Sequence, residues 1–269
     1  MIWPLFVAAA VSAAPVATSL SAHELLAGAN HAVGAHRLDQ ATLMLSRAVA
    51  AGASGPELDR TLAGLAYASG NYAEALARYE ALLKAAPADR SLLEPAGISA
   101  LKVGDVERAS SLLSLTTSSP GAGWRSWNAL GVVADLKADW AKADMCYDRA
   151  SKLAPNAVGP VNNRGWSLLL RGSWQRAIGY FERAVALDPK SRRAANNLEL
   201  AKSALAAELP QREPGEPDSA WAARLNDAGV AAEITGDRQR ATAAFTQALE
   251  VSGTWYSRAA NNLELLGSR

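Results

Sequence analysis

The sequence has few of the residues that build disulfides, metal centres and nucleophilic active sites. Among its 269 residues there is one cysteine, Cys146, and the three histidines are His23, His31 and His36. A single cysteine excludes an intramolecular disulfide and a multi-cysteine metal site, and these histidine spacings do not place two imidazoles on one metal. A glycine-rich phosphate loop and the HExxH and GxSxG motifs are absent as well. We therefore expect no enzymatic activity, no metal and no cofactor.

Aromatic residues and a charge excess are also scarce. Phe, Tyr and Trp make up 6% of the chain, which together with the scarcity of β-branched runs argues against a β-sandwich or barrel. The 27 basic residues are balanced by 26 acidic ones. Nucleic acid is therefore not expected as a partner, because binding it requires a basic surface. In contrast, 59 alanines and 49% apolar residues favour helices around a substantial core.

The first 21 residues resemble an export signal. Residues 2–17 are mostly apolar, a length that is short for a membrane span but suits the apolar region of a secretory signal. No basic residue precedes Arg37, so the positive start of such signals is reduced to the amino terminus. We expect a mature chain in the periplasm or cell envelope without a transmembrane span. Two alternatives remain: an apolar helix capping the first repeat of a cytoplasmic protein, and a start site that omits a basic leader.

Alanine recurs at a fixed interval along most of the chain. The first five positions are evenly spaced, and the sixth follows after slightly less than two further intervals: Ala41, Ala75, Ala109, Ala143, Ala177 and Ala241. Twelve residues earlier stands a tiny residue: Ala29, Ala63, Gly97, Gly131, Gly165 and Gly229. Four residues later stands a large apolar one: Leu45, Tyr79, Leu113, Tyr147, Phe181 and Phe245. A period of 34 predicts a helical hairpin repeated along the chain, with the tiny residue where two helices approach closely.

Helix-ending residues follow the same period. Pro87, Pro155 and Pro189 lie twelve residues after the recurring alanine, and Pro120 lies one place early. Proline cannot continue a helix, so each repeat is expected to end there. Turn signals such as Gly70-Asn71 separate the two helices of a repeat.

Residues 22–267 resemble the tetratricopeptide repeat family in this pattern. The repeat that matches its signature best carries Trp127, Leu130, Gly131, Ala134, Ala143, Tyr147, Ala150 and Pro155. The resemblance implies an all-α solenoid, in which antiparallel helix pairs stack into a right-handed superhelix with capping helices. The first helix of each pair would line the inner face. Stability would come from stacking neighbouring pairs, because one pair cannot bury its apolar face alone.

The period breaks once, which predicts a division of the chain. Residues 191–208 read as the first helix of a sixth repeat, but its second helix is replaced by a segment with three prolines and a glycine at 209–218. The sequence RAANNLEL occurs at both 193–200 and 258–265, so each part is expected to end in a capping helix. We predict five repeats and a cap at 22–208, a linker at 209–218, and one repeat and a cap at 219–269. The alternative is a surface loop within one continuous solenoid.

A series of asparagines suggests where a partner would bind. Asn128, Asn162 and Asn226 lie fifteen residues before the recurring alanine, and Asn196 has the same register. An amide side chain can bond to the backbone of an extended peptide, so these residues are candidates for an inner groove. The candidate apolar neighbours, one helical turn later, are Val132, Trp166, Leu200 and Val230, and Arg125 and Arg193 would add a preference for acidic partners. The alternative is that the amides bond between adjacent repeats.

The last hundred or so residues resemble the tetratricopeptide protein of tight-adherence (Flp) pilus assembly, a TadD-like protein. The resemblance rests on the closing pattern from Phe245 to Leu263 together with the export signal. It implies a non-enzymatic scaffold whose partners are pilus or secretion assembly components. Two other hypotheses stay open: a cytoplasmic adaptor or chaperone, and a subunit that regulates an envelope enzyme.

Overall fold

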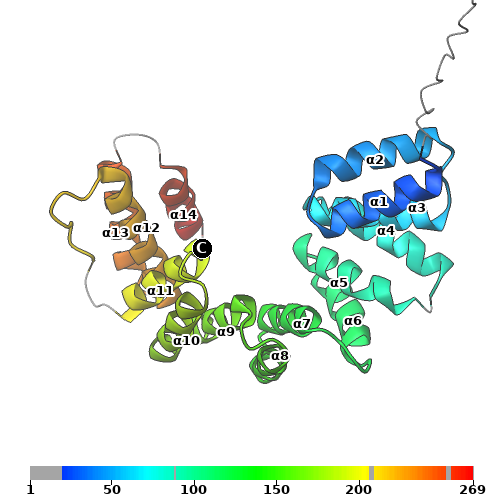
Figure 1. The fold of residues 1–269 in the computed structure, drawn as a ribbon. Helices are drawn as coiled ribbons and strands as arrows, with labels where there is room; N and C mark the ends of the chain where they lie inside the picture. Colours follow the sequence, from blue (N-terminus) through cyan, green and yellow to red (C-terminus); the bar gives the residue numbers. More distant parts are fainter. Residues whose placement is uncertain (1–19, 88, 206–208, 253–255, 269) are drawn as a thin grey trace, which may run out of the picture. The chain divides into compact units, whose positions relative to one another are not determined.

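The computed structural model describes residues 20–87, 89–205, 209–252 and 256–268. All regular structure in these ranges is helical, with fourteen α-helices and one 3-10 turn (Figure 1). The all-α prediction is confirmed, and so is the repeated pairing of antiparallel helices. The apolar stretch at 2–17, interpreted above as an export signal, lies outside the described residues.

The described chain forms two compact units that meet in sequence between Pro87 and Ala88. The first unit contains two helix pairs: α1 (Ala22–Gly34) with α2 (Leu38–Ala50), and α3 (Pro56–Ala68) with α4 (Tyr72–Ala85). Its core holds Leu25, Leu26 and Ala29 of α1 against Leu45 and Ala48 of α2. Ser21 caps α1 through a reciprocal pair of hydrogen bonds with Glu24, which fixes the start of the first repeat.

The second unit contains the remaining helices. Its pairs are α5 (Leu93–Lys102), preceded by the 3-10 turn η1 (Arg90–Leu92), with α6 (Val106–Thr117); α7 (Trp124–Leu136) with α8 (Trp140–Leu153); α9 (Val158–Leu170) with α10 (Trp174–Leu187); and α12 (Asp218–Ile234) with α13 (Arg238–Val251). Two helices stand without a second helix of their own, α11 (Arg192–Leu205) and α14 (Ser257–Gly267). The first helices α5, α7, α9 and α11 are successive neighbours.

The tiny and large residues of each repeat interlock, as the sequence predicts. A Cβ atom added at Gly131 would lie 2.6 Å from Cε1 of Tyr147, and one added at Gly165 would lie 2.7 Å from Cε1 of Phe181. The same close approach joins Gly97 to Leu113. The six recurring alanines, which pack beside these pairs, are completely buried: Ala41, Ala75, Ala109, Ala143, Ala177 and Ala241. Glycine therefore stands where a ring of the second helix needs the space of a side chain.

The helix ends also agree with the sequence. Each of α4, α8 and α10 stops two residues before its proline, at Ala85, Leu153 and Leu187. The turns within repeats use a residue with positive φ, as at Gly70 (77°) and Gly172 (71°). At the same place two repeats carry His36 and Ala138, both at φ 54°. The turn geometry is thus kept even where a side chain makes the left-handed conformation costly.

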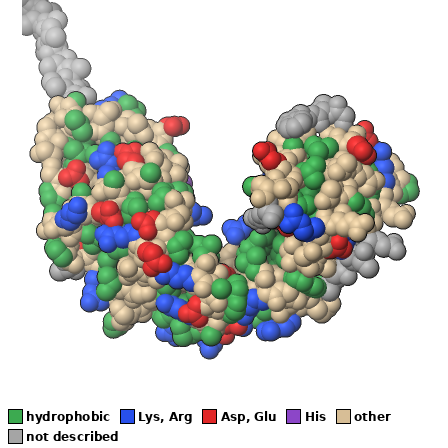
Figure 2. All heavy atoms as spheres, turned by 180° about the vertical axis from the view of Figure 1, so that it is seen from behind, with side chains coloured by type: hydrophobic (Ala, Val, Ile, Leu, Met, Phe, Trp, Pro, Cys, Tyr) green, Lys and Arg blue, Asp and Glu red, His purple; other side chains and the backbone are tan. Residues whose placement is uncertain are grey.

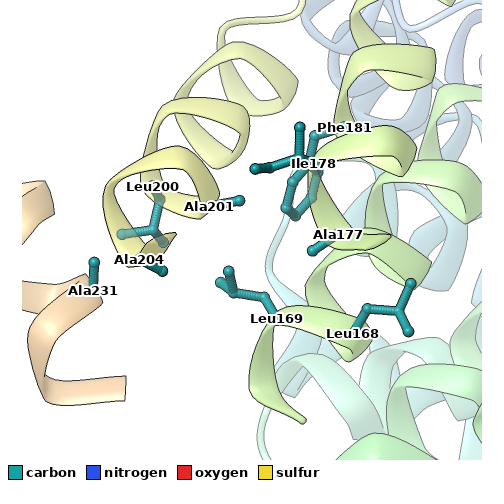
Figure 3. Close-up of a cluster of buried hydrophobic side chains, with 9 residues drawn as sticks. All are labelled: Leu168, Leu169, Ala177, Ile178, Phe181, Leu200, Ala201, Ala204 and Ala231. Carbon is teal, nitrogen blue, oxygen red and sulfur yellow. The ribbon is translucent and has the colours of Figure 1, made fainter. Parts of the chain in front are cut away.

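Helix α11 is part of a continuous core rather than an exposed end. Figure 3 shows Leu200, Ala201 and Ala204 of α11 between Phe181 of α10 and Ala231 of α12. Packing of α12 on α11 therefore continues the stack across the proline-rich segment within the second unit. By contrast, α14 packs against α12 and α13.

The segment at 209–217 is not helical, as its prolines require, and it is held against α12 by two arginines. The Arg224 guanidinium donates to the Glu213 and Glu216 carboxylates, at 3.1 Å each. Arg212 donates to the Glu216 carbonyl at 2.8 Å and to the Asp218 carboxylate at 2.5 Å. The compact units divide at residue 87, whereas the sequence suggested a division at 209–218, which stays a prediction.

Candidate functional site: a groove along the first helices of the second unit

Two adjoining hollows lie along the first helices of the second unit. The larger has a volume of about 450 Å³ and is lined from α5, α7, α9 and α11. The smaller, of about 220 Å³, is lined mainly from α7 and α9. They share Val132, Leu136, Asn163 and Arg193, so together they form one groove, called the A-helix groove below.

Five of the sequence-predicted residues line this groove. Asn128, Val132 and Arg125 of α7 line the larger hollow, Trp166 of α9 lines the smaller, and Arg193 of α11 lines both. Arg125 is exposed and stacks over the Trp124 ring, with its guanidinium carbon 4.8 Å from the ring centre. The structure therefore brings these five candidates together on one surface. Their role in binding stays a prediction.

The other five candidates lie elsewhere. The side chains of Asn162 and Asn226 are buried, at 2% and 5% exposure, and Leu200 is a core residue at 7%. Val230 packs against two buried clusters, and Asn196 is exposed on α11 outside the two hollows. These five side chains are therefore less able to contact a ligand in the A-helix groove than the first five.

Most of the asparagines are engaged with one another across repeats. Asn163 donates from Nδ2 to Oδ1 of Asn128 at 3.0 Å, and Asn197 donates to Oδ1 of Asn162 at 2.9 Å. In the last repeat, Asn262 donates to Oδ1 of Asn226 at 3.0 Å. In each pair the acceptor is a predicted asparagine. The donor belongs to the next repeat, where it directly follows the residue equivalent to that acceptor. Sequence reasoning missed these donors, although the repeated Asn-Asn pairs at 162–163, 196–197 and 261–262 were a visible signal.

The duplicated sequence places an arginine near equivalent residues in both copies, with one difference. Arg193 donates to Oδ1 of Asn163 at 2.9 Å. Its counterpart Arg258 lies near enough to Asp227, the residue equivalent to Asn163, for its charge to favour the ionised carboxylate. Burial nevertheless raises the pKa of Asp227 above its ordinary value. The partner of Arg193 is therefore a neutral amide, whereas the second arginine has a carboxylate near it.

Sequence reasoning also missed part of the apolar lining. Leu136 and Leu170 are 61% and 43% exposed and both line the A-helix groove. Lys102 occupies the position equivalent to Leu136 one repeat earlier, and Ile98 occupies the position of Val132. Both positions follow from the repeat register extended by one helical turn beyond the predicted apolar set, so the period could have identified them.

A half-buried carboxylate, Asp135, lines the smaller hollow. Asp135 accepts a hydrogen bond from the Tyr147 hydroxyl at 2.7 Å and another from the Ser167 hydroxyl at 2.6 Å. Burial raises the pKa of Asp135 above its ordinary value of 3.8, although both hydroxyls and the Arg171 charge favour the ionised form. Burial also raises the pKa of Tyr147, which stays a neutral donor. Asp135 therefore connects α7, α8 and α9 beneath the groove.

We expect the stability contributed by Asp135 to fall as pH rises. A raised folded-state pKa means that the folded chain holds this proton more tightly, so the contribution is complete below about 3.8 and is lost as pH rises through the folded pKa. Relative to wild type, Asp135→Asn should gain free energy of unfolding between pH 3.5 and pH 7 in urea titrations. Glu182→Gln, which removes an exposed carboxylate from α10, is the control and should show no such trend. A pH-independent difference for Asp135→Asn would contradict the expectation.

Neither a metal-ligand cluster nor an exposed thiol is found among the described residues. They contain no group of three or more His, Cys, Asp and Glu side chains placed to hold a metal ion. Cys146 is completely buried, and burial raises the pKa of its thiol to about 11, so it is a core residue as the sequence indicated. No helix in the described ranges is both long and apolar enough to span a bilayer. On the face that Figure 2 shows, Lys and Arg side chains are interspersed with Asp and Glu.

Family comparisons agree with the repeat pattern. Two models described as tetratricopeptide repeat match this chain, one over residues 26–91 and the other over residues 161–191. A comparison with curated proteins gave no significant match. The tetratricopeptide repeat family is thus supported in both units, and its members are typically non-enzymatic scaffolds that mediate protein–protein interactions.

Solved structures with the same fold have distant sequences. A tetratricopeptide repeat protein from Parabacteroides merdae is 17% identical, with a TM-score of 0.56, and the match covers 91% of this chain and 98% of that one. The MamA protein of Desulfovibrio magneticus is also 17% identical, with a TM-score of 0.52, and the match covers 64% of this chain and 97% of that one. At this level of identity the similarity concerns the fold alone.

Proposed function

We propose that this chain of tetratricopeptide repeats is a scaffold that binds an extended segment of a partner protein in the A-helix groove. The observation that carries the proposal is the groove itself, where Leu136 and Leu170 are exposed beside amide and cationic groups. Large apolar side chains exposed in a concave surface with polar groups around them are typical of a binding site. Repeat solenoids commonly use such surfaces for binding.

Site-specific photo-crosslinking tests the binding surface. A photoreactive amino acid at Leu170 should form covalent adducts with a partner protein in cells, because this side chain lies in the groove. The control places the same amino acid at Met145, which is 54% exposed on the second helix α8. We expect several times more adduct at position 170. Equal adducts at both positions, or none at 170, would count against the groove.

We further propose that the partner belongs to an envelope assembly machine such as the Flp pilus. Support comes from the likeness of the closing residues 245–263 to the pilus-assembly tetratricopeptide protein and from the apolar residues 2–17. Mass spectrometry of the adduct at 170 should then identify a secretin or another pilus component, and fractionation should place the protein in the envelope. A full-length cytosolic protein would favour the adaptor alternative, and an adduct with a synthase would favour the regulatory one.

A further inference from the structure

The hydrogen bonds within the A-helix groove leave it mainly with donors. The Oδ1 atom of Asn163 accepts from Arg193, and the Oδ1 atom of Asn128 accepts from Asn163. Amide oxygens that would otherwise meet a ligand are thus already engaged within the protein. Among the lining residues, the Asn128 amino group and the guanidinium N–H groups of Arg193 and Arg125 can donate hydrogen bonds and cannot accept them.

The charge of the groove has the same bias. Besides Lys102, which interacts with another group of the protein, the larger hollow is lined by two cationic side chains, Arg125 and Arg193, and by no carboxylate. The smaller is lined by Arg193 and by Asp135, both of whose oxygens accept hydrogen bonds from protein hydroxyls. Although the whole chain is nearly neutral, the groove is therefore locally positive, and apolar residues are exposed in the same place.

The duplicated region shows that this charge is not required by the fold. The same backbone motif in the last repeat carries Asp227 opposite Arg258, where the first copy carries Asn163 opposite Arg193. The amide contact between repeats persists in both copies, through Asn197 and through Asn262. The last repeat thus accommodates a carboxylate at this position, whereas Asn163 adds no negative charge to the groove.

From this excess of donors and positive charge we infer that the A-helix groove selects an extended protein segment rich in Asp and Glu that also carries large apolar side chains. Carboxylates of the segment would accept from Arg125, Arg193 and the Asn128 amide. An apolar side chain would enter the smaller hollow between Val132, Trp166 and Leu170. The inference rests on the proposed function and adds the chemistry of the partner, since charge complementarity fixes specificity and apolar burial supplies area.

Selection from random dodecapeptides displayed on phage tests this inference with the full chain as bait. Peptides retained by the wild type should be enriched in Asp and Glu, together with aromatic residues or leucine, relative to the starting pool. The acidic enrichment should disappear with the double variant Arg125→Glu/Arg193→Glu. It should persist with Arg183→Glu, which reverses an exposed charge on the second helix α10.

A conservative substitution separates charge from folding. Asn163→Asp places a carboxylate beside Arg193, as Asp227 stands near Arg258, and also removes the amide that donates to Asn128; it should weaken a selected acidic peptide by roughly tenfold in fluorescence anisotropy. Circular dichroism should show that the helical content is kept. Raising the salt concentration from 50 to 500 mM should weaken the wild-type complex as well, because salt screens exposed charges.

Each result has a definite reading. A retained pool without acidic enrichment, or equal affinity of Asn163→Asp and wild type for the acidic peptide, overturns the acidic specificity. The groove as a binding surface would survive either outcome if the crosslink at position 170 forms. Absence of that crosslink would instead remove the proposed function.

Discussion

Phe181→Ala should lower the free energy of unfolding of the second unit by about 3–5 kcal/mol, the usual cost of deleting a fully buried phenylalanine. Phe181 is completely buried in the cluster shared by α9, α10, α11 and α12. Truncation of the ring leaves a cavity beside Gly165. Because Gly165 has no side chain to fill it, the variant loses the contacts of the ring and keeps an empty space. Neighbouring repeats stabilise one another, and the defect should therefore weaken α11 and α12 as well.

Tryptophan fluorescence in urea measures this effect, since seven of the eight tryptophans lie between residues 124 and 255. Met145→Ala on the adjacent α8 is the control; this side chain is 54% exposed, and its loss should change stability by no more than about 0.5 kcal/mol. A cost below about 1 kcal/mol for Phe181→Ala would show that the ring does not hold the repeats together as described.

The second large effect is a sign reversal for one substitution made at two helical glycines. Gly131→Ala should destabilise the second unit, because the new methyl would lie 2.6 Å from Cε1 of Tyr147, a completely buried ring whose hydroxyl is bonded to Asp135. Overpacking costs about 1–3 kcal/mol, which exceeds the gain of up to about 1 kcal/mol from the higher helix propensity of alanine.

Gly179→Ala in α10 is the matched control, since an added Cβ there has no neighbouring atom within 4 Å. Only the propensity gain remains, so this variant should be more stable than wild type by about 0.5–1 kcal/mol. The same urea titration serves both variants. Stabilisation by both substitutions would refute the close helix approach at Gly131, and Gly131→Ala in a Tyr147→Leu background should recover part of the loss.

Repeat architecture was predictable because its determinants are local and periodic. A tiny residue, a buried alanine and a large ring at constant offsets specify one helix face and its mate, and prolines such as Pro155 specify where the helix ends. These requirements recur with the same period along the chain, so each repeat reinforces the interpretation of the others. Only the boundary of the compact units, at residue 87, was absent from this pattern.

The groove was only partly predictable. Equivalent repeat positions place Asn128 on the groove surface but Asn162 among buried residues. Extending the register by one turn would have added Leu136 and Leu170, since both obey the same period. The period does not show, however, which amide oxygen accepts a hydrogen bond within the protein, because the donor is a side chain of the next repeat.

Residues within one repeat set the helical hairpins, their length, their order and the interlocking of glycine with ring, so these features could be predicted from the order of amino acids. The packing of the repeats sets which candidates reach the groove, that their amides bond to one another, and that Arg193 bonds to Asn163 while Arg258 lies near Asp227. The physical reason is that burial and hydrogen bonding of a side chain depend on neighbours a whole repeat away in sequence, as in Asn163 with Asn128. Those neighbours come into contact only when the repeats stack.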